Sequence, residues 1–211
     1  MKRFAMIVAL LAFCMGAQAQ EKIYEVKSGI ITMEMDMMGR PTVQEIYFDD
    51  YGAKKATISN FGDRKMRMIT VDGANLMVND AEKSATRMPM GGPMMGGPGG
   101  GQGRGETINF TNLDEKTIKK FKIKELGKET VAGKECTKYQ VTVFMMGQPQ
   151  KQTVWVYKGV TLKTESKTGF GEMVQAATKF EEDVEIPTST FALPEGYQIK
   201  EMEMRRMGGE W

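Results

Sequence analysis

The chain has 211 residues, a formal net charge of +2 and no histidine. Its hydrophobic content of 41% is sufficient for a packed core and too high for a wholly disordered chain. Without histidine the chain has no Ser-His-Asp or Cys-His catalytic site, and it lacks the commonest zinc ligand. The near balance of charges argues against a nucleic-acid-binding protein. Twenty methionines are the feature of the composition that these exclusions leave unexplained.

The first nineteen residues have the pattern of a secretory signal peptide. Lys2 and Arg3 precede an apolar run over 4–15, and Ala17-Gln18-Ala19 matches the small-x-small cleavage pattern. The run is shorter than the roughly 20 apolar residues of a transmembrane helix. We therefore predict cleavage after Ala19 and export to the periplasm, or the exterior, of a Gram-negative bacterium. The exported chain would be neutral, and Cys136 would have no partner for an internal disulfide.

Short strands separated by turn residues follow the leader. Residues 31–37 alternate apolar with polar side chains, which is typical of a half-buried strand. A β-branched and aromatic run over 43–48 predicts a second strand, and Asp72-Gly73 predicts a tight hairpin turn. The remaining strands expected in this half are 54–60, 66–71 and 75–79.

A change of composition interrupts the strands at 88–105. This stretch is rich in glycine, methionine and proline and cannot bury enough side chain to offset its ordering entropy, so we predict a flexible loop. Short helices are expected on either side, at 80–87 and 113–121. Asn112 is the expected N-cap of the second helix.

The C-terminal half returns to strands joined by short, glycine-containing links. Short links make consecutive strands antiparallel neighbours. The prediction is a mainly β, single domain over 20–201, built on one curved antiparallel sheet and followed by a C-terminal tail at 202–211. Its further strands are expected at 122–131, 135–145, 151–158, 160–167 and 173–185.

The methionines occur in clusters that allow two interpretations. Thioether sulfur is a soft ligand that selects Cu(I) or Ag(I), so the loop cluster is a candidate metal site. Methionine is also an adaptable apolar residue that suits surfaces contacting variable ligands. We favour apolar lining and keep the metal as the alternative. The loop cluster consists of Met88, Met90, Met94 and Met95.

Three segments of the C-terminal half resemble a known family. They are GKETVAGKECTKYQV (127–141), TVWVYKGVTLKTES (153–166) and TKFEEDVEIPTSTFALPEGYQIKE (178–201), the last with a Pro-x-x-x-Phe-x-Leu-Pro-x-Gly-Tyr pattern. Their succession is similar to the outer-membrane lipoprotein-sorting superfamily of LolA and LolB. More narrowly, it resembles an uncharacterised exported domain family common in Bacteroidetes. The resemblance implies an open half-barrel of antiparallel strands, with helices over a hydrophobic concave face that binds acyl chains.

No catalytic constellation is found. The acidic groups 181–183 and 49–50 are expected at solvated edges or turns, and Cys136 is expected to be structural. We predict a protein without enzymatic activity or cofactor that binds a lipid or a lipoprotein acyl chain. An envelope structural or interaction module with a protein partner is a further alternative. The predicted apolar lining is Ile31, Met33, Met35, Met37, Met66, Met68 and Trp155.

Overall fold

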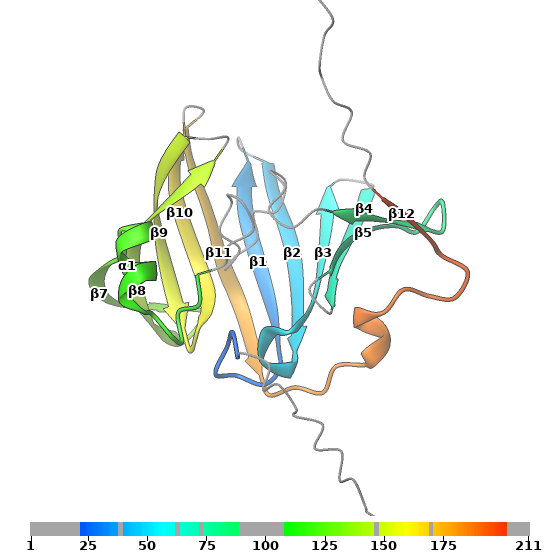
Figure 1. Cartoon of the computed structure of the whole chain (residues 1–211), viewed down its shortest axis with the longest axis horizontal. Helices are drawn as coiled ribbons and strands as arrows, with labels where there is room; N and C mark the ends of the chain where they lie inside the picture. The colour runs from blue at the N-terminus through cyan, green and yellow to red at the C-terminus, as the bar shows by residue number, and fades with distance from the viewer. Residues whose placement is uncertain are drawn as a thin grey trace, which may run out of the picture.

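A single curved sheet dominates the protein. The computed structural model describes residues 22–37, 40–61, 64–71, 74–88, 108–145, 148–168 and 171–201. They form one twelve-stranded sheet in the order β12-β6-β5-β4-β3-β2-β1-β11-β10-β9-β8-β7. The sheet bends strongly and does not close into a barrel (Figure 1). The predicted antiparallel open half-barrel is confirmed.

The first half of the chain builds one arm of the sheet through successive antiparallel hairpins. Its strands are β1 (Gly29–Met37), β2 (Arg40–Asp49), β3 (Lys54–Phe61), β4 (Arg64–Val71), β5 (Ala74–Asn79) and β6 (Ser84–Met88). Val71 pairs with Ala74, so β4 and β5 form the predicted hairpin, whereas the turn predicted at Asp72-Gly73 lies outside the described residues.

The second half builds the other arm and then returns to the first. Ala132-Gly133 and Lys158-Gly159 have positive φ at both residues, as two-residue hairpin turns of type I′ require. The last long strand pairs with β1, and this pairing joins the two arms. The strands of this arm are β7 (Lys124–Val131), β8 (Lys134–Met145), β9 (Gln148–Tyr157), β10 (Val160–Thr168) and β11 (Gly171–Glu182).

One of the two predicted helices is present. Helix α1 (Glu115–Phe121) lies within the predicted range, but its N-cap is Asp114, which accepts a hydrogen bond from the Thr117 N–H, and not Asn112. The helix predicted at 80–87 is wrong, because residues 84–88 are strand β6. Pairing with β5 buries Ala85 completely, and this tertiary contact outweighs the local helix propensity of 81–83.

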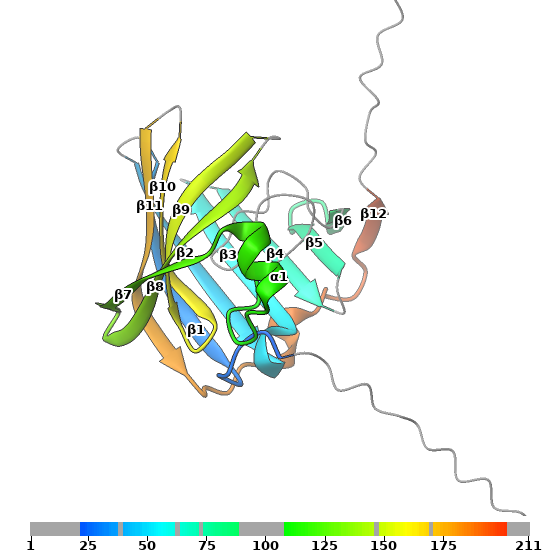
Figure 2. The ribbon, with the colours of Figure 1, turned by 60° about the vertical axis from the view of Figure 1, so that its left-hand side comes forward.

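Cross-strand pairing defines two faces of the sheet, because directly opposed residues point to the same side. The inner face carries the row Ile31–Ile46–Thr57–Met68–Met77. The outer face carries the row Ile30–Tyr47–Ala56–Ile69–Leu76. Helix α1 lies on the inner side of the curve (Figure 2).

The chain after β11 covers the outer face. We call residues 183–197 the C-terminal strap. Its Ile186 and Phe191, the latter in the short helix η2 (Thr188–Phe191), pack with Ala56, whereas Leu193 and Tyr197 pack with the cluster of Ile69, Leu76, Val78 and Ala85. Strand β12 (Gln198–Glu201) then pairs with β6 in parallel. The Pro-x-x-x-Phe-x-Leu-Pro-x-Gly-Tyr pattern is therefore the covering of one arm.

No helix in the described part of the chain is long and apolar enough to cross a membrane.

Candidate ligand-binding face

Seven methionines share the inner face of the sheet. Met68 and Met77 are directly opposed, and the others follow from strand alternation and from the rows of paired residues. We call this set the methionine face. Its members are Met33 and Met35 on β1, Met66 and Met68 on β4, Met77 on β5, Met88 on β6 and Met173 on β11.

Methionine is confined to one side of the arm from β3 to β6. Among the side chains described there, the apolar residues of the inner face are all methionine: Met66, Met68, Met77 and Met88. The outer face of the same strands has none and uses Ala, Ile, Leu and Val under the strap. General core filling would place methionine on both faces, so the inner face selects for flexible thioether side chains.

The solvent exposure of the side chains varies across the methionine face. Met33 is completely buried and Met88 is 7% exposed, whereas Met66 is 41% exposed. Met35, Met68, Met77 and Met173 are half-buried. An accessible, deformable apolar surface is thus continuous with the core.

Polar side chains lie among these methionines. The Gln175 amide Nε2 donates to Gln44 Oε1 at 2.9 Å, and the pair spans β1 beside Met33 and Met35. Gln175 is 7% exposed, and its hydrogen bond offsets the desolvation cost of a buried amide. Other buried polar residues on this face include Thr42, Ser59, Ser84 and Ser166.

Two described segments pack at the ends of the inner face. Residues 108–123, with α1, cover an apolar cluster of β8 and β9 that includes Val141 and Val154. At the other end Tyr24 meets Phe48 edge to face, with ring centroids 4.9 Å apart. These packed ends frame the methionine face.

The structure brings most of the predicted lining residues onto one face. Met35, Met66 and Met68 share it with Ile31 and Met33, but the last two lie in the core, at 3% and 0% exposure. Met37 ends β1, and its side chain lies outside the described residues.

Trp155 lies in the buried core. At 1% exposure, it belongs to the same buried cluster as the inner-face residues Ile31 and Met33. Its indole lies beneath the ammonium groups of Lys138 and Lys163, 4.6 and 4.3 Å from the ring centroid. Trp155 is therefore part of the core that continues from the methionine face.

Several inner-face residues were not predicted as lining, among them Met77, Met173, Gln44 and Gln175. The alternation of 74–79 indicates the orientation of Met77. The glutamines carry no such signal, since their role depends on β11 pairing beside β1.

The loop predicted to hold metal is described only at its first residue. Met88 ends β6 on the inner face, whereas Met90, Met94 and Met95 lie outside the described residues. The same is true of the predicted leader at 1–19 and tail at 202–211.

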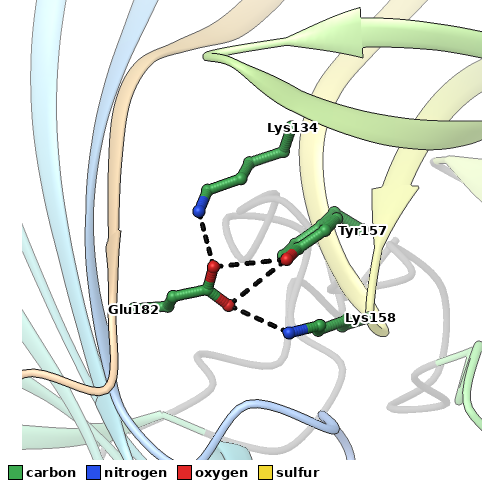
Figure 3. A network of polar contacts seen from close by, with 4 residues as sticks. All are labelled: Lys134, Tyr157, Lys158 and Glu182. Carbon is green, nitrogen blue, oxygen red and sulfur yellow. Dashed lines mark hydrogen bonds and ion pairs between the residues drawn. The ribbon is translucent and has the colours of Figure 1, made fainter.

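A charged network joins β11 to two hairpin turns. Glu182 accepts hydrogen bonds from Lys134 at 2.5 Å, from Lys158 at 3.2 Å and from the Tyr157 hydroxyl at 3.2 Å (Figure 3). Lys134 holds the pKa of Glu182 below its usual value, with help from Lys158. Glu182 is 22% exposed, so it is not the solvated edge residue that was expected. These interactions therefore hold the β7–β8 and β9–β10 hairpins against β11.

Cys136 and the carboxylates are the other candidate reactive groups among the described residues. Cys136 is completely buried, and burial raises the pKa of its thiol to about 11, which suppresses the nucleophilic thiolate. No group of three or more His, Cys, Asp or Glu side chains in this part of the chain could hold a metal ion.

Comparison with known proteins identifies the fold. No family model matches the sequence, and no curated protein matches it. An uncharacterized conserved protein from Thermus thermophilus superposes with a TM-score of 0.54 and 6% identity, over 84% of this chain and 92% of that one. MucB superposes with a TM-score of 0.51 and 13% identity, over 82% of this chain. At these identities the likeness is one of fold.

Two further solved structures are also similar in fold. MucB in the Pseudomonas aeruginosa MucA/MucB complex matches at 15% identity with a TM-score of 0.51, over 78% of this chain. The chain spans only 61% and 55% of the two MucB chains. A LolA superfamily protein from Nitrosomonas europaea matches at 9% identity with a TM-score of 0.39, over 80% of this chain and 91% of that one.

Proposed function

We propose that this protein is an exported, non-enzymatic binding protein that holds a lipid or acyl chain against its methionine face. The confinement of methionine to the inner side of β3–β6 carries the proposal. Unbranched thioether side chains adapt to ligands of variable shape, whereas the branched residues of the outer face serve a fixed interior. The predicted leader at 1–19 supports export.

The energetics favour an extended apolar ligand. Burial of apolar surface contributes roughly 25 cal/mol per Å², less the cost of immobilising the ligand. The Gln44–Gln175 pair adds hydrogen-bonding groups at β1, which suits a ligand with a polar end, such as an ester or a carboxylate. The site would thus accept a chain along β4–β6 with its polar end near β1.

An analysis of the native ligand tests this proposal. The protein is purified without detergent, its organic extract is examined by mass spectrometry, and the delipidated protein is titrated with a fluorescent fatty acid. We expect copurified lipid and saturable uptake of the probe. A lipid-free preparation that also fails to take up the probe would refute the proposal.

A protein partner is the second candidate, because MucB of similar fold was solved in complex with MucA. We infer that such a partner would engage the same inner face. Pull-down from envelope extracts with and without detergent separates the candidates, because detergent competes for an acyl-chain site.

A further inference from the structure

We infer that Met66, Met68 and Met77 form a binding site for a soft monovalent cation, Cu(I) or Ag(I), on the inner face of β4 and β5. Here we call these three residues the thioether site. The site is distinct from the loop cluster suggested by the sequence, with which it shares no residue.

Strand register places the three side chains within reach of one another. Met68 is directly opposite Met77, an arrangement that puts the two Cβ atoms about 4.5–5.5 Å apart. Met66 is two residues along β4 on the same face, roughly 6.6 Å from Met68. Met66 is also diagonal to Met77, and diagonal neighbours are about 7–8 Å apart.

The side chains can converge on a single ion. Each sulfur lies two bonds beyond its Cβ on an unbranched chain, so rotations about χ1 and χ2 move the sulfurs of opposed residues together. Met66 is 41% exposed, whereas Met68 and Met77 are half-buried. An ion would therefore enter beside Met66 and be held by half-buried Met68 and Met77.

The framework beside the site is fixed. The Thr70 hydroxyl donates to Asn75 Oδ1 at 2.6 Å, in the pair adjacent to Met68 and Met77. This bond ties β4 to β5 next to the proposed ligands, so only side-chain rotation is needed for binding.

The donor chemistry selects the ion. Thioethers are soft, neutral ligands that favour Cu(I) over hard divalent cations. The inner face of β3–β6 has no Asp or Glu among its described side chains, and its remaining residues are Lys, Thr, Ser and Asn. Calcium and magnesium, which require carboxylate or carbonyl oxygen, find no suitable ligands there.

Titration with Ag⁺ alone, in a chloride-free buffer, tests the site without a redox step. We expect one equivalent to bind first, and we expect the Met68→Leu/Met77→Leu variant to bind that equivalent at least tenfold more weakly. The matched control Met35→Leu/Met173→Leu removes two thioethers from the same face on β1 and β11, and should stay within twofold of the parent protein. Equal affinity of the two double variants would overturn the inference.

Methyl-labelled methionine NMR gives a readout that does not depend on affinity. The first equivalent of Ag⁺ should shift the methyl resonances of the thioether site, assigned through single Met→Leu variants. Shifts confined to other methionines would refute the site.

Separate titrations of the parent protein distinguish this inference from the lipid proposal. Leucine keeps the surface apolar and close in volume, so Met68→Leu/Met77→Leu should keep the melting temperature of the parent while Ag⁺ binding falls. Absence of fatty-acid uptake by the parent protein would refute the lipid proposal and leave the silver result unaffected.

Discussion

At the scale of single residues, hydrogen bonds to charged groups show the roles of residues that composition alone does not distinguish. Glu182 is one of three consecutive acidic residues, yet it alone receives Lys134, Lys158 and Tyr157. Its neighbour Glu181 pairs only with the more exposed Lys179, at 2.9 Å. We therefore interpret Glu182 as a residue that stabilises the fold.

Glu182→Gln should lower the free energy of unfolding at pH 7 by roughly 1–2 kcal/mol, because two ammonium groups lose a half-buried carboxylate. The pKa of Glu182 is lowered in the folded protein, so its contribution is present above the unfolded pKa of about 4.3 and is lost as the pH falls through the folded pKa. Urea unfolding at pH 7 and pH 3 measures both effects. Glu181→Gln is the control and should change stability little. An equal loss at both pH values would contradict this account.

At the scale of elements, three segments meet at the turn between β9 and β10. Gly159 has φ +83°, and a Cβ there would lie 2.5 Å from Thr111 Cγ2 and 2.8 Å from the Ile23 carbonyl oxygen. The Asn109 amide and the Thr111 hydroxyl both donate to the Lys22 carbonyl at 3.2 Å. The glycine therefore allows the segment before β1 and the segment before α1 to dock against this turn.

Gly159→Ala should destabilise the protein by several kcal/mol, because the left-handed backbone and the two close contacts act together. Gly133→Ala is the matched control: its φ is +75° and nothing lies within 4 Å, so it should cost only about 1–2 kcal/mol. Thermal and urea unfolding compare the pair. Equal losses would show that the three segments do not pack as described.

The C-terminal strap makes a second prediction at this scale. Phe191 is 4% exposed against the outer face, so Phe191→Ala should reduce the free energy of unfolding by roughly 3 kcal/mol. Leu126, 51% exposed on β7, supplies the control, and Leu126→Ala should remain within about 0.5 kcal/mol of the parent. Similar unfolding midpoints for the two variants would mean that the strap does not stabilise the sheet.

Local sequence pattern predicts where the strands lie better than it predicts which segments pack against them. Apolar–polar alternation and the glycine turns identify β1–β5 and β7–β11, because both signals act within a few residues. The helix expected at 80–87 fails because burial of Ala85 against β4 and β5 depends on contacts outside the segment. Strand β12 and the strap are equally non-local, since each forms only on an assembled sheet.

At the scale of the whole molecule, the return of β11 to β1 completes the candidate site. The methionines of β1, β4, β5 and β6 lie on the first arm, and Met173 and Gln175 of β11 join them only when the two arms pair. Alternation within a strand predicts that Met33 and Met35, or Met66 and Met68, point together. It does not predict that Trp155 packs in the same buried cluster as Met33, because that contact forms only in the assembled sheet.

The two faces of this single sheet have different roles in our account. The outer face of β3–β6 is sealed by the C-terminal strap, and the inner face presents adaptable methionines with a buried amide pair beside them. We therefore place the proposed ligand-binding role on the inner face.

Fatty-acid titration of two matched variants tests this claim most directly. Met66 and Val43 are 41% and 40% exposed, but Met66 is on the inner face and Val43 is on the outer face, paired with Glu34. Met66→Glu should weaken binding of a fluorescent fatty acid at least tenfold, because it puts a charge where the chain would lie, and Val43→Glu should bind like the parent. Unchanged affinity in Met66→Glu, or an equal loss in Val43→Glu, would contradict the assignment of ligand binding to the methionine face.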